Sequence, residues 1–369
     1  MDTKKSNILQ LPAIILLLCA QPVFGEKAEM LSPEKADAVL AYFHQFAESP
    51  DGQHVAYTLF DPPERMLVVV HTLSTGKISP VAMVKGQNRH TGTHPLWVDN
   101  HTLIYCSDAD YRIYHHDLKS GNVVEYAGGQ ISDYSPLYNM VLYNGKNADK
   151  EEKGLYSIDL DNGSKKQLIS LDDMAELKDE VGIKSAIEHW RLDHPYWSPD
   201  GQKIMFQLKT YRGKARASEV FLFYTDPEAT KIHYVGVRPM HVQWWDNESY
   251  FGHDNHEKDD KHLRRWDLNG KMIEELSGPG CHGTVSADRQ WIVTESWYKS
   301  DPIIVNLYKR GETKPTQELF RQPAVVKGKV FWDIRSHIHP SFSRDGQRVY
   351  FNAQGSDGKS KVWFHDLQR

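Results

Sequence analysis

The sequence has few cysteines and no second long hydrophobic run. Only three cysteines occur in 369 residues, and one of them, Cys19, lies in an N-terminal apolar segment, so a disulfide scaffold is excluded. No later segment approaches the about 20 apolar residues that a membrane helix needs. The sequence also lacks a Gly-rich phosphate loop, a Cys-x-x-Cys pair and a Gly-x-Ser-x-Gly elbow. It therefore gives no support to a serine hydrolase.

Positive charge is not in excess either. The chain has 44 Lys and Arg against 49 Asp and Glu, a net charge of -5, which argues against nucleic acid as a partner. Hydrophobic residues make up 40% and charged residues 25%, values that fit a globular protein and exclude a disordered or collagen-like chain. The 19 His, 10 Trp and 18 Tyr indicate strands, carbohydrate surfaces or metal chemistry without choosing among them.

The N-terminal segment has the pattern of an export signal. Lys4 and Lys5 precede an apolar stretch from Ile8 to Ala20, and a plausible cleavage position follows Gly25. We therefore expect residues 1–25 to be a signal peptide and the protein to be periplasmic or secreted. Lipid anchoring through Cys19 is less expected, because the three leucines before it lack the small residue of a lipoprotein processing site.

Internal repetition is the most informative feature of the remaining sequence. The phrase His-Pro-x-x-Ser-x-Asp-Gly, followed by a run of apolar residues, occurs from His194 and again from His339, and its second half recurs as Ser49-Pro50-Asp51-Gly52. Weaker copies begin at His94, His241 and His282, and a seventh lies around Tyr134–Tyr138. Each copy is typical of a strand, a tight turn and a second strand.

The repeat length predicts the fold class. Without about 25 leader residues the chain gives seven units of roughly 49 residues, which is the size of a four-stranded blade. We expect an all-β protein, a seven-bladed β-propeller that forms a single domain over residues 26–369. The polar segment 168–187 departs from the repeat and predicts a short helical insertion between blades.

Function must be argued from the site, because propellers support many activities. The His that opens each phrase recurs at one offset, so the side chains should converge near the axis; these residues are His94, His194, His241, His282 and His339. A repeat His could instead only hydrogen-bond a neighbouring blade, but His241 and His282 persist where the Pro of the phrase is absent. The polar loop that contains His253, His256 and His262 is expected to be solvated.

A metal site is the sharper hypothesis for this ring. His337 stands two residues before His339, a spacing that directs both side chains to one face of a strand. With His282 from the adjacent blade they would supply three imidazole nitrogens and leave coordination positions open, as in catalytic metal sites.

These motifs resemble the oligogalacturonate lyases of polysaccharide lyase family 22, seven-bladed propellers that use manganese. The resemblance runs from about blade 4 to the C-terminus through His194-Pro195-Tyr196, Met240–Trp244, Cys281-His282 and Ser336–Phe342. It implies that His241 is the catalytic base and that His282, His337 and His339 hold a divalent metal, Mn²⁺ ahead of Ca²⁺ or Zn²⁺. It also implies that an Arg binds substrate, for which Arg216 is the best match and Arg212 the next.

The sequence departs from that family in two respects. The family has a Gln ligand three residues before the first His of the pair, where this chain has Ile334. Water or Asp333 could take that place, the site could bind metal weakly, or the substrate could differ. The export signal is the second departure, because better-known members act in the cytoplasm.

The resemblance predicts a lyase that cleaves short uronate oligosaccharides by β-elimination. Such a reaction must remove the proton α to a carboxylate, which a divalent cation and a bidentate Arg would make more acidic. His241 fits the base because His titrates near neutral pH, with His194 as the alternative base. Trp244 could stack on a sugar ring, and His94 completes the predicted substrate-binding residues.

A second hypothesis stays open at this stage. The Ser-Pro-Asp-Gly repeats are also similar to those of a periplasmic translocation-associated propeller, so the chain could be a non-catalytic protein that binds a peptide or protein partner in its channel. The sequence does not indicate an oligomeric state.

Overall fold

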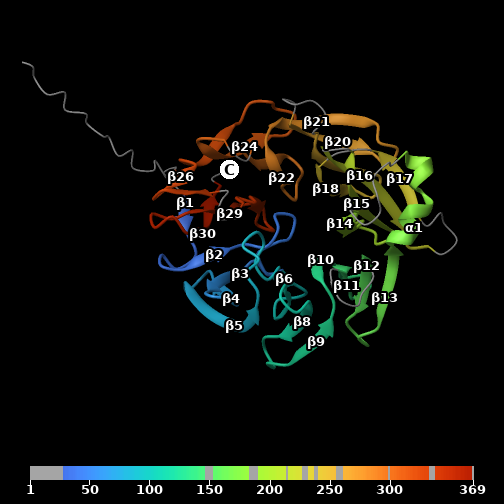
Figure 1. The fold of residues 1–369 in the computed structure, drawn as a ribbon. Coiled ribbons are helices and arrows are strands. Elements are labelled where there is room, and N and C mark those ends of the chain that lie inside the picture. The colour runs from blue at the N-terminus through green and yellow to red at the C-terminus, as the bar shows by residue number, and fades with distance from the viewer. Residues whose placement is uncertain are drawn as a thin grey trace, which may run out of the picture.

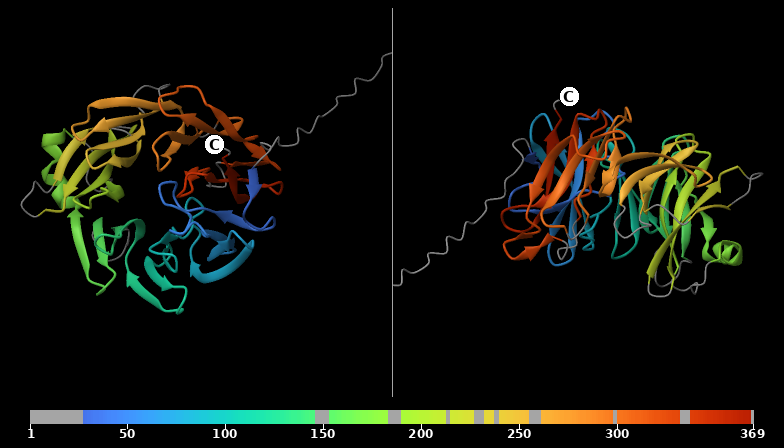
Figure 2. Two further views of the ribbon diagram at one scale, coloured as in Figure 1. Left: turned by 180° about the vertical axis from the view of Figure 1, so that it is seen from behind. Right: turned by 90° about the horizontal axis from the view of Figure 1, so that it is seen from above.

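The chain folds into seven four-stranded antiparallel sheets arranged around a central axis (Figure 1; Figure 2 shows the ring from behind and from above). The computed structural model describes residues 28–145, 153–182, 190–212, 215–226, 232–236, 240–254, 261–297, 300–331 and 337–367, with the backbone alone at 180, 210–212 and 215–218. The expected all-β, seven-bladed propeller is confirmed.

Each blade runs in sequence from its innermost to its outermost strand, except the last. Blade 1 comprises β2 (Asp37–Val39), β3 (His54–Asp61), β4 (Arg65–Thr72) and β5 (Lys77–Lys85). Blade 2 comprises β6 (Leu96–Trp97), β7 (Thr102–Ser107), β8 (Arg112–Asp117) and β9 (Val123–Ala127). Blade 3 comprises β10 (Gln130–Ser135), β11 (Met140–Gly145), β12 (Gly154–Asp159) and β13 (Lys165–Ser170). Blade 4 comprises β14 (Arg191–Trp197), β15 (Lys203–Arg212), β16 (Ala215–Tyr224) and β17 (Ile232–Gly236). Blade 5 comprises β18 (Met240–Asp246), β19 (Ser249–His253), β20 (His262–Asp267) and β21 (Met272–Pro279). Blade 6 comprises β22 (Cys281–Val285), β23 (Trp291–Glu295), β24 (Ile303–Lys309) and β25 (Gln317–Gln322).

The last blade closes the ring with strands from both ends of the chain. Blade 7 has the order β28 (Ser341–Phe342), β29 (Arg348–Gln354), β30 (Ser360–Asp366) and then β1 (Ala28–Met30). β1 pairs antiparallel with β30. A small hairpin of β26 (Val325–Val326) and β27 (Lys329–Val330) precedes this blade.

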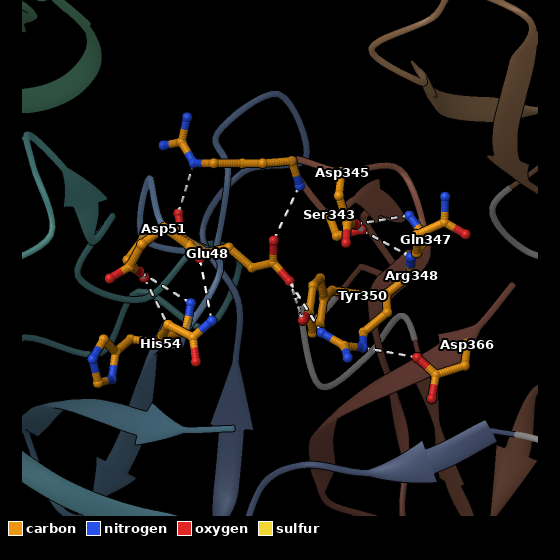
Figure 3. Close-up of polar contacts among 12 residues, drawn as sticks. Glu48, Asp51, His54, Ser343, Asp345, Gln347, Arg348, Tyr350 and Asp366 are labelled. Atoms are coloured by element: carbon orange, nitrogen blue, oxygen red, sulfur yellow. Dashed lines mark hydrogen bonds and ion pairs between the residues drawn. The ribbon is translucent and has the colours of Figure 1, made fainter. Parts of the chain in front are cut away.

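Polar contacts join blade 1 to blade 7 beside this closure (Figure 3). Glu48 is buried, with 2% of its surface exposed, and its carboxylate accepts hydrogen bonds from the backbone N–H of Arg344 and from the hydroxyl of Tyr350. The Arg348 guanidinium lies 3.8 Å from the same carboxylate. These contacts connect residues about 300 positions apart in the chain.

The Asp-Gly phrases form the tight turns that the sequence predicted. In blade 4 the Asp200 carboxylate accepts hydrogen bonds from the Ser198 hydroxyl and the Gln202 backbone N–H, and Gly201 has a φ of 71°. A left-handed φ suits glycine, which has no Cβ to clash. Blades 1 and 7 repeat the serine-to-aspartate contact and the left-handed glycine.

Two short helices lie between blades 3 and 4. α1 (Leu171–Glu176) begins with a capping box in which Ser170 and Asp173 bond each other's backbone N–H, and α2 (Lys178–Val181) ends at Gly182. Met174 of α1 packs with Trp190 in the core of blade 4. Within the described part of the chain, neither these helices nor any other is long and apolar enough to cross a bilayer.

Candidate active site

All five repeat histidines adopt the left-handed backbone conformation. Their φ values lie between 46° and 57°, in His94, His194, His241, His282 and His339. In blades 4, 5 and 6 the pairing register shifts at this point, so that two residues of the inner strand oppose one residue of its partner. The phrase therefore encodes a β-bulge, a device that redirects a side chain next to active sites.

The bulges bring the imidazoles of consecutive blades together. Ring centroids are 6.2 Å apart for His194 and His241, 4.3 Å for His241 and His282, and 4.6 Å for His282 and His339. The Nε2 of His94 instead lies 2.5 Å from the Thr91 hydroxyl and 2.7 Å from the Gln130 amide nitrogen. Four of the five repeat histidines thus form one cluster.

An aromatic segment from blade 1, which the sequence analysis missed, fills the middle of this ring. Tyr42 is stacked on His194 with a centroid distance of 5.1 Å and meets His339 edge-on at 4.8 Å, and Phe43 lies 5.1 Å from His282. A partial signal was available, because Tyr42-Phe43-His44 directly precedes Gln45, which occupies the place where other copies carry their histidine.

The three predicted metal ligands are close neighbours. His282, His337 and His339 have centroid distances of 4.6, 5.3 and 5.3 Å. His339 is fully buried, and neither of its ring nitrogens has a hydrogen-bond partner among the described residues. Burial lowers the pKa of His282 to about 3 and that of His337 to about 4, so both rings are neutral at pH 7. Neutral imidazoles fit a divalent transition-metal ion.

The structure adds His90, from the loop between β5 and β6. Its ring lies 4.2 Å from His337 and 4.7 Å from His339, and one nitrogen of each of these three residues lies within 4.8 Å of the others. His90 stands outside the repeated phrase, so the spacing argument could not find it.

A buried carboxyl group contacts two of these histidines, one at its ring and the other at its backbone. Glu295 at the end of β23 is completely buried; its Oε1 lies 2.7 Å from His282 Nδ1, and its Oε2 accepts the backbone N–H of His339 at 2.9 Å. A carboxylate on one ring nitrogen fixes the orientation of the other, as around metal-bound histidines. The sequence analysis missed Glu295, although one signal was available: Glu295 is a charged residue at the end of the apolar run that begins at Trp291.

A second group of possible ligands contains His241, Cys281 and His282, also within 4.8 Å. Cysteine binds metal as the thiolate, and burial raises the pKa of the Cys281 thiol well above its usual range. This group therefore fits a cation less well than the His90 group.

The two candidate bases differ in how their nitrogens are used. In His194, Nε2 lies 2.9 Å from the Lys209 ammonium and Nδ1 lies 3.3 Å from the Tyr196 hydroxyl. His241 Nδ1 has no hydrogen-bond partner in the described part of the chain. Burial lowers the pKa of both rings well below 6.5, aided by His282 for His241 and by Lys209 for His194. Of the two, His241 has the more available nitrogen.

The remaining predicted residues lie apart from the cluster or outside the description. The Trp244 indole N–H donates to the Tyr196 carbonyl oxygen at 2.9 Å, and its ring packs between blades 4 and 5. Arg216 lies in β16 and Arg212 ends β15, but the structure does not describe the side chain of either residue. Asp333 and Ile334 lie outside the described residues.

A cavity of about 620 Å³ lies over the imidazoles. Its lining includes Tyr42, His194, His241 and His282, and also His94, as the sequence predicted. Lys209 and Arg191 of blade 4 contribute positive charge to it and both contact Asp193. The volume lies within the usual range of small-molecule sites.

Solved structures with the same fold include two oligogalacturonate lyases. One, in complex with manganese, has 16% sequence identity and a TM-score of 0.66 over 95% of this chain and 96% of its own. The other, from Vibrio parahaemolyticus, has 15% identity and a TM-score of 0.64 over 92% and 93%.

Other comparisons are less complete. A puromycin-hydrolyzing peptidase from Mycobacterium tuberculosis has a TM-score of 0.55 at 13% identity, but the match covers 52% of that chain. No family model and no curated protein matches the sequence. The resemblance to the oligogalacturonate lyases therefore holds at the level of the fold, and it extends beyond blades 4–7 to nearly the whole chain.

Proposed function

We propose that this protein is an exported, metal-dependent lyase that cleaves short uronate oligosaccharides, such as oligogalacturonates, by β-elimination. The observation that carries the proposal is the cluster of neutral imidazoles beneath the cavity, in which candidate metal ligands adjoin a histidine with an available nitrogen. His241 and His282 are 4.3 Å apart by ring centroids. A base beside a cation is the arrangement that removal of a proton α to a carboxylate requires.

The charges of the cavity suit an acidic substrate. Lys209 and Arg191 both contact the carboxylate of Asp193, so this wall of three side chains carries one excess positive charge, while Asp108 adds a carboxylate elsewhere in the cavity lining. Although burial alone would raise it, the pKa of Asp193 is held well below its usual range by Lys209, His194 and Arg191. We assign this wall, together with Arg216, to binding the uronate carboxylates.

In the proposed reaction His241 removes the proton from C5 of the uronate, and the electron pair left on C5 forms the 4,5-double bond as the C4–O glycosidic bond breaks. The oxygen of the departing sugar then takes a proton from water. His241 is neutral because burial and neighbouring charges lower its pKa, so it can accept the proton. His194 positions the substrate through Lys209, with which it already shares a contact. His282, His337 and His339 would hold a divalent cation, which would offset the charge of the carboxylate and acidify the adjacent proton.

The direct test is the ultraviolet absorbance of the unsaturated uronate, measured on digalacturonate and trigalacturonate with Mn²⁺. We expect His241→Ala to lower turnover by about 10²–10⁴-fold, the usual contribution of a general base. EDTA should abolish activity and added Mn²⁺ restore it. His101→Ala serves as the control and should retain activity. His101 lies in the hairpin between β6 and β7, at the opposite end of β7 from Ser107, which lines the cavity.

The proposal fails if neither substrate is cleaved in the presence of Mn²⁺, or if His241→Ala is as active as the unmodified chain. A propeller that only binds a peptide or protein would give no absorbance change with any metal.

A further inference from the structure

We propose that His90 is itself a ligand of the divalent cation, together with His337 and His339, so that the cation connects the loop entering blade 2 to the segment entering blade 7. This inference extends the proposed function by naming a ligand, but cation binding can be measured without substrate.

The first support is the placement of the three rings. His90 lies 4.2 Å from His337 and 4.7 Å from His339, and these two lie 5.3 Å apart, all between ring centroids. One nitrogen from each residue lies within 4.8 Å of the others, a separation that a common ion at about 2.1 Å from each nitrogen can bridge after small ring rotations.

The second support is the unsatisfied state of His339. This imidazole is completely buried, and both its nitrogens are without a hydrogen-bond partner among the described residues. Buried polar groups nearly always have a partner, so an orphaned ring indicates that something else binds there.

The third support is that both segments are held in place without the ion. The side-chain Oδ1 of Asn88 accepts a hydrogen bond from the His90 backbone N–H. The backbone carbonyl of Asn88 accepts one from the Gly92 backbone N–H. On the other side, the His337 carbonyl accepts a hydrogen bond from the Asn352 amide, and the His339 N–H is bonded to Glu295. A preorganised ligand set of this kind binds metal with little ordering cost.

Three imidazoles favour a borderline transition-metal ion over a hard cation. Imidazole suits Zn²⁺ best, Mn²⁺ binds the same donors more weakly, and Ca²⁺ prefers six to eight oxygens. We therefore expect the EDTA-treated protein to bind Zn²⁺ and Mn²⁺ at one site and to show no comparable binding of Ca²⁺.

The test is calorimetric titration of the EDTA-treated full chain with Zn²⁺ and Mn²⁺. We expect His90→Ala to raise the Kd at least tenfold and to change the visible spectrum of bound Co²⁺. His90→Phe keeps a ring in the same space but cannot bind metal, and it should weaken binding equally. His101→Gln, in the hairpin between β6 and β7 and outside the cavity lining, is the control and should leave the Kd within about twofold.

Unchanged affinity in either folded His90 variant would overturn the inference and favour a site built from His282, His337 and His339 without His90. The result is independent of catalysis. Loss of binding in the His90 variants with no uronate cleavage by the unmodified chain would support the ligand and reject the lyase, whereas cleavage with unaltered binding would do the reverse.

Discussion

His253 is a buried imidazole with both ring nitrogens bonded to backbone groups. Its Nε2 accepts the Gly283 N–H at 2.9 Å, so Nδ1 carries the proton and donates to the Lys261 carbonyl at 3.1 Å. The sequence analysis expected a solvated loop here, and for His253 that prediction is wrong, because all of β19 is buried. His256 lies outside the described residues.

This environment predicts a pH-dependent contribution to stability. Burial lowers the pKa of His253 to about 3, against about 6.5 in an unfolded chain. Its contribution is therefore fully present above pH 6.5 and is lost as the pH falls, by about 1.4 kcal/mol per pH unit. Between pH 7.5 and pH 5 the folded protein should lose about 2 kcal/mol through this group.

The measurement compares the unmodified chain with His253→Gln, whose amide can both donate and accept but does not titrate. The difference in the free energy of unfolding, from urea denaturation, should shrink by about 2 kcal/mol from pH 7.5 to pH 5. A difference that stays constant over this range would show that His253 is not held neutral by its surroundings.

Single residues also mark the limit of what the sequence could predict about the site. The ring of repeat histidines was predictable, because its members share one offset in a repeat and the repeat fixes where they point. His90 was not, because it stands outside the repeat and is brought to His339 by contacts between different blades. Such contacts follow from packing in three dimensions, which no local pattern encodes.

At the level of elements, the repeated phrase determined most of the fold. Alternating apolar residues and Asp-Gly turns were sufficient to predict the hairpins and the number of blades. The bulge at each repeat histidine was not predicted, because a left-handed histidine has no sequence signature comparable to that of glycine. The bulge is nevertheless what aligns His241 with His282.

The bulge gives a prediction that separates backbone strain from loss of the imidazole. His241 has a φ of 57°, a conformation that costs a residue with a Cβ about 1–2 kcal/mol and costs glycine nothing. Both His241→Ala and His241→Gly remove the ring. We expect the Gly variant to be more stable than the Ala variant by about 1 kcal/mol, the reverse of the usual order in strands.

Urea unfolding of the two variants is the appropriate measurement, because their folded states differ only in one methyl group. Pro is excluded from the comparison, since its ring cannot adopt a positive φ. If the Ala variant is the more stable, the backbone at His241 is not strained in the folded protein.

At the level of the whole molecule, the ring depends on the junction of blades 1 and 7. The ladder between β1 and β30 has three residue pairs, and an apolar cluster with Leu40, Tyr57 and Tyr350 lies beneath it. The Leu40 N–H also donates to the side-chain oxygen of Asn352 at 2.9 Å. Because each blade buries its faces against its neighbours, weakening this junction exposes the faces of both blades.

Glu48 provides the test of this junction (Figure 3). Glu48→Ala leaves the Arg344 N–H and the Tyr350 hydroxyl without an acceptor inside the protein, and each buried donor left unpaired costs about 1–3 kcal/mol. We expect the free energy of unfolding to fall by about 2–4 kcal/mol, with faster proteolysis near both termini. Asp366→Ala removes the other carboxylate of the same network, which pairs with Arg348 and whose side chain is 56% exposed. Exposed ion pairs contribute about 0–1 kcal/mol, so a similar loss in both variants would show that the closing contacts are no more important than any surface pair.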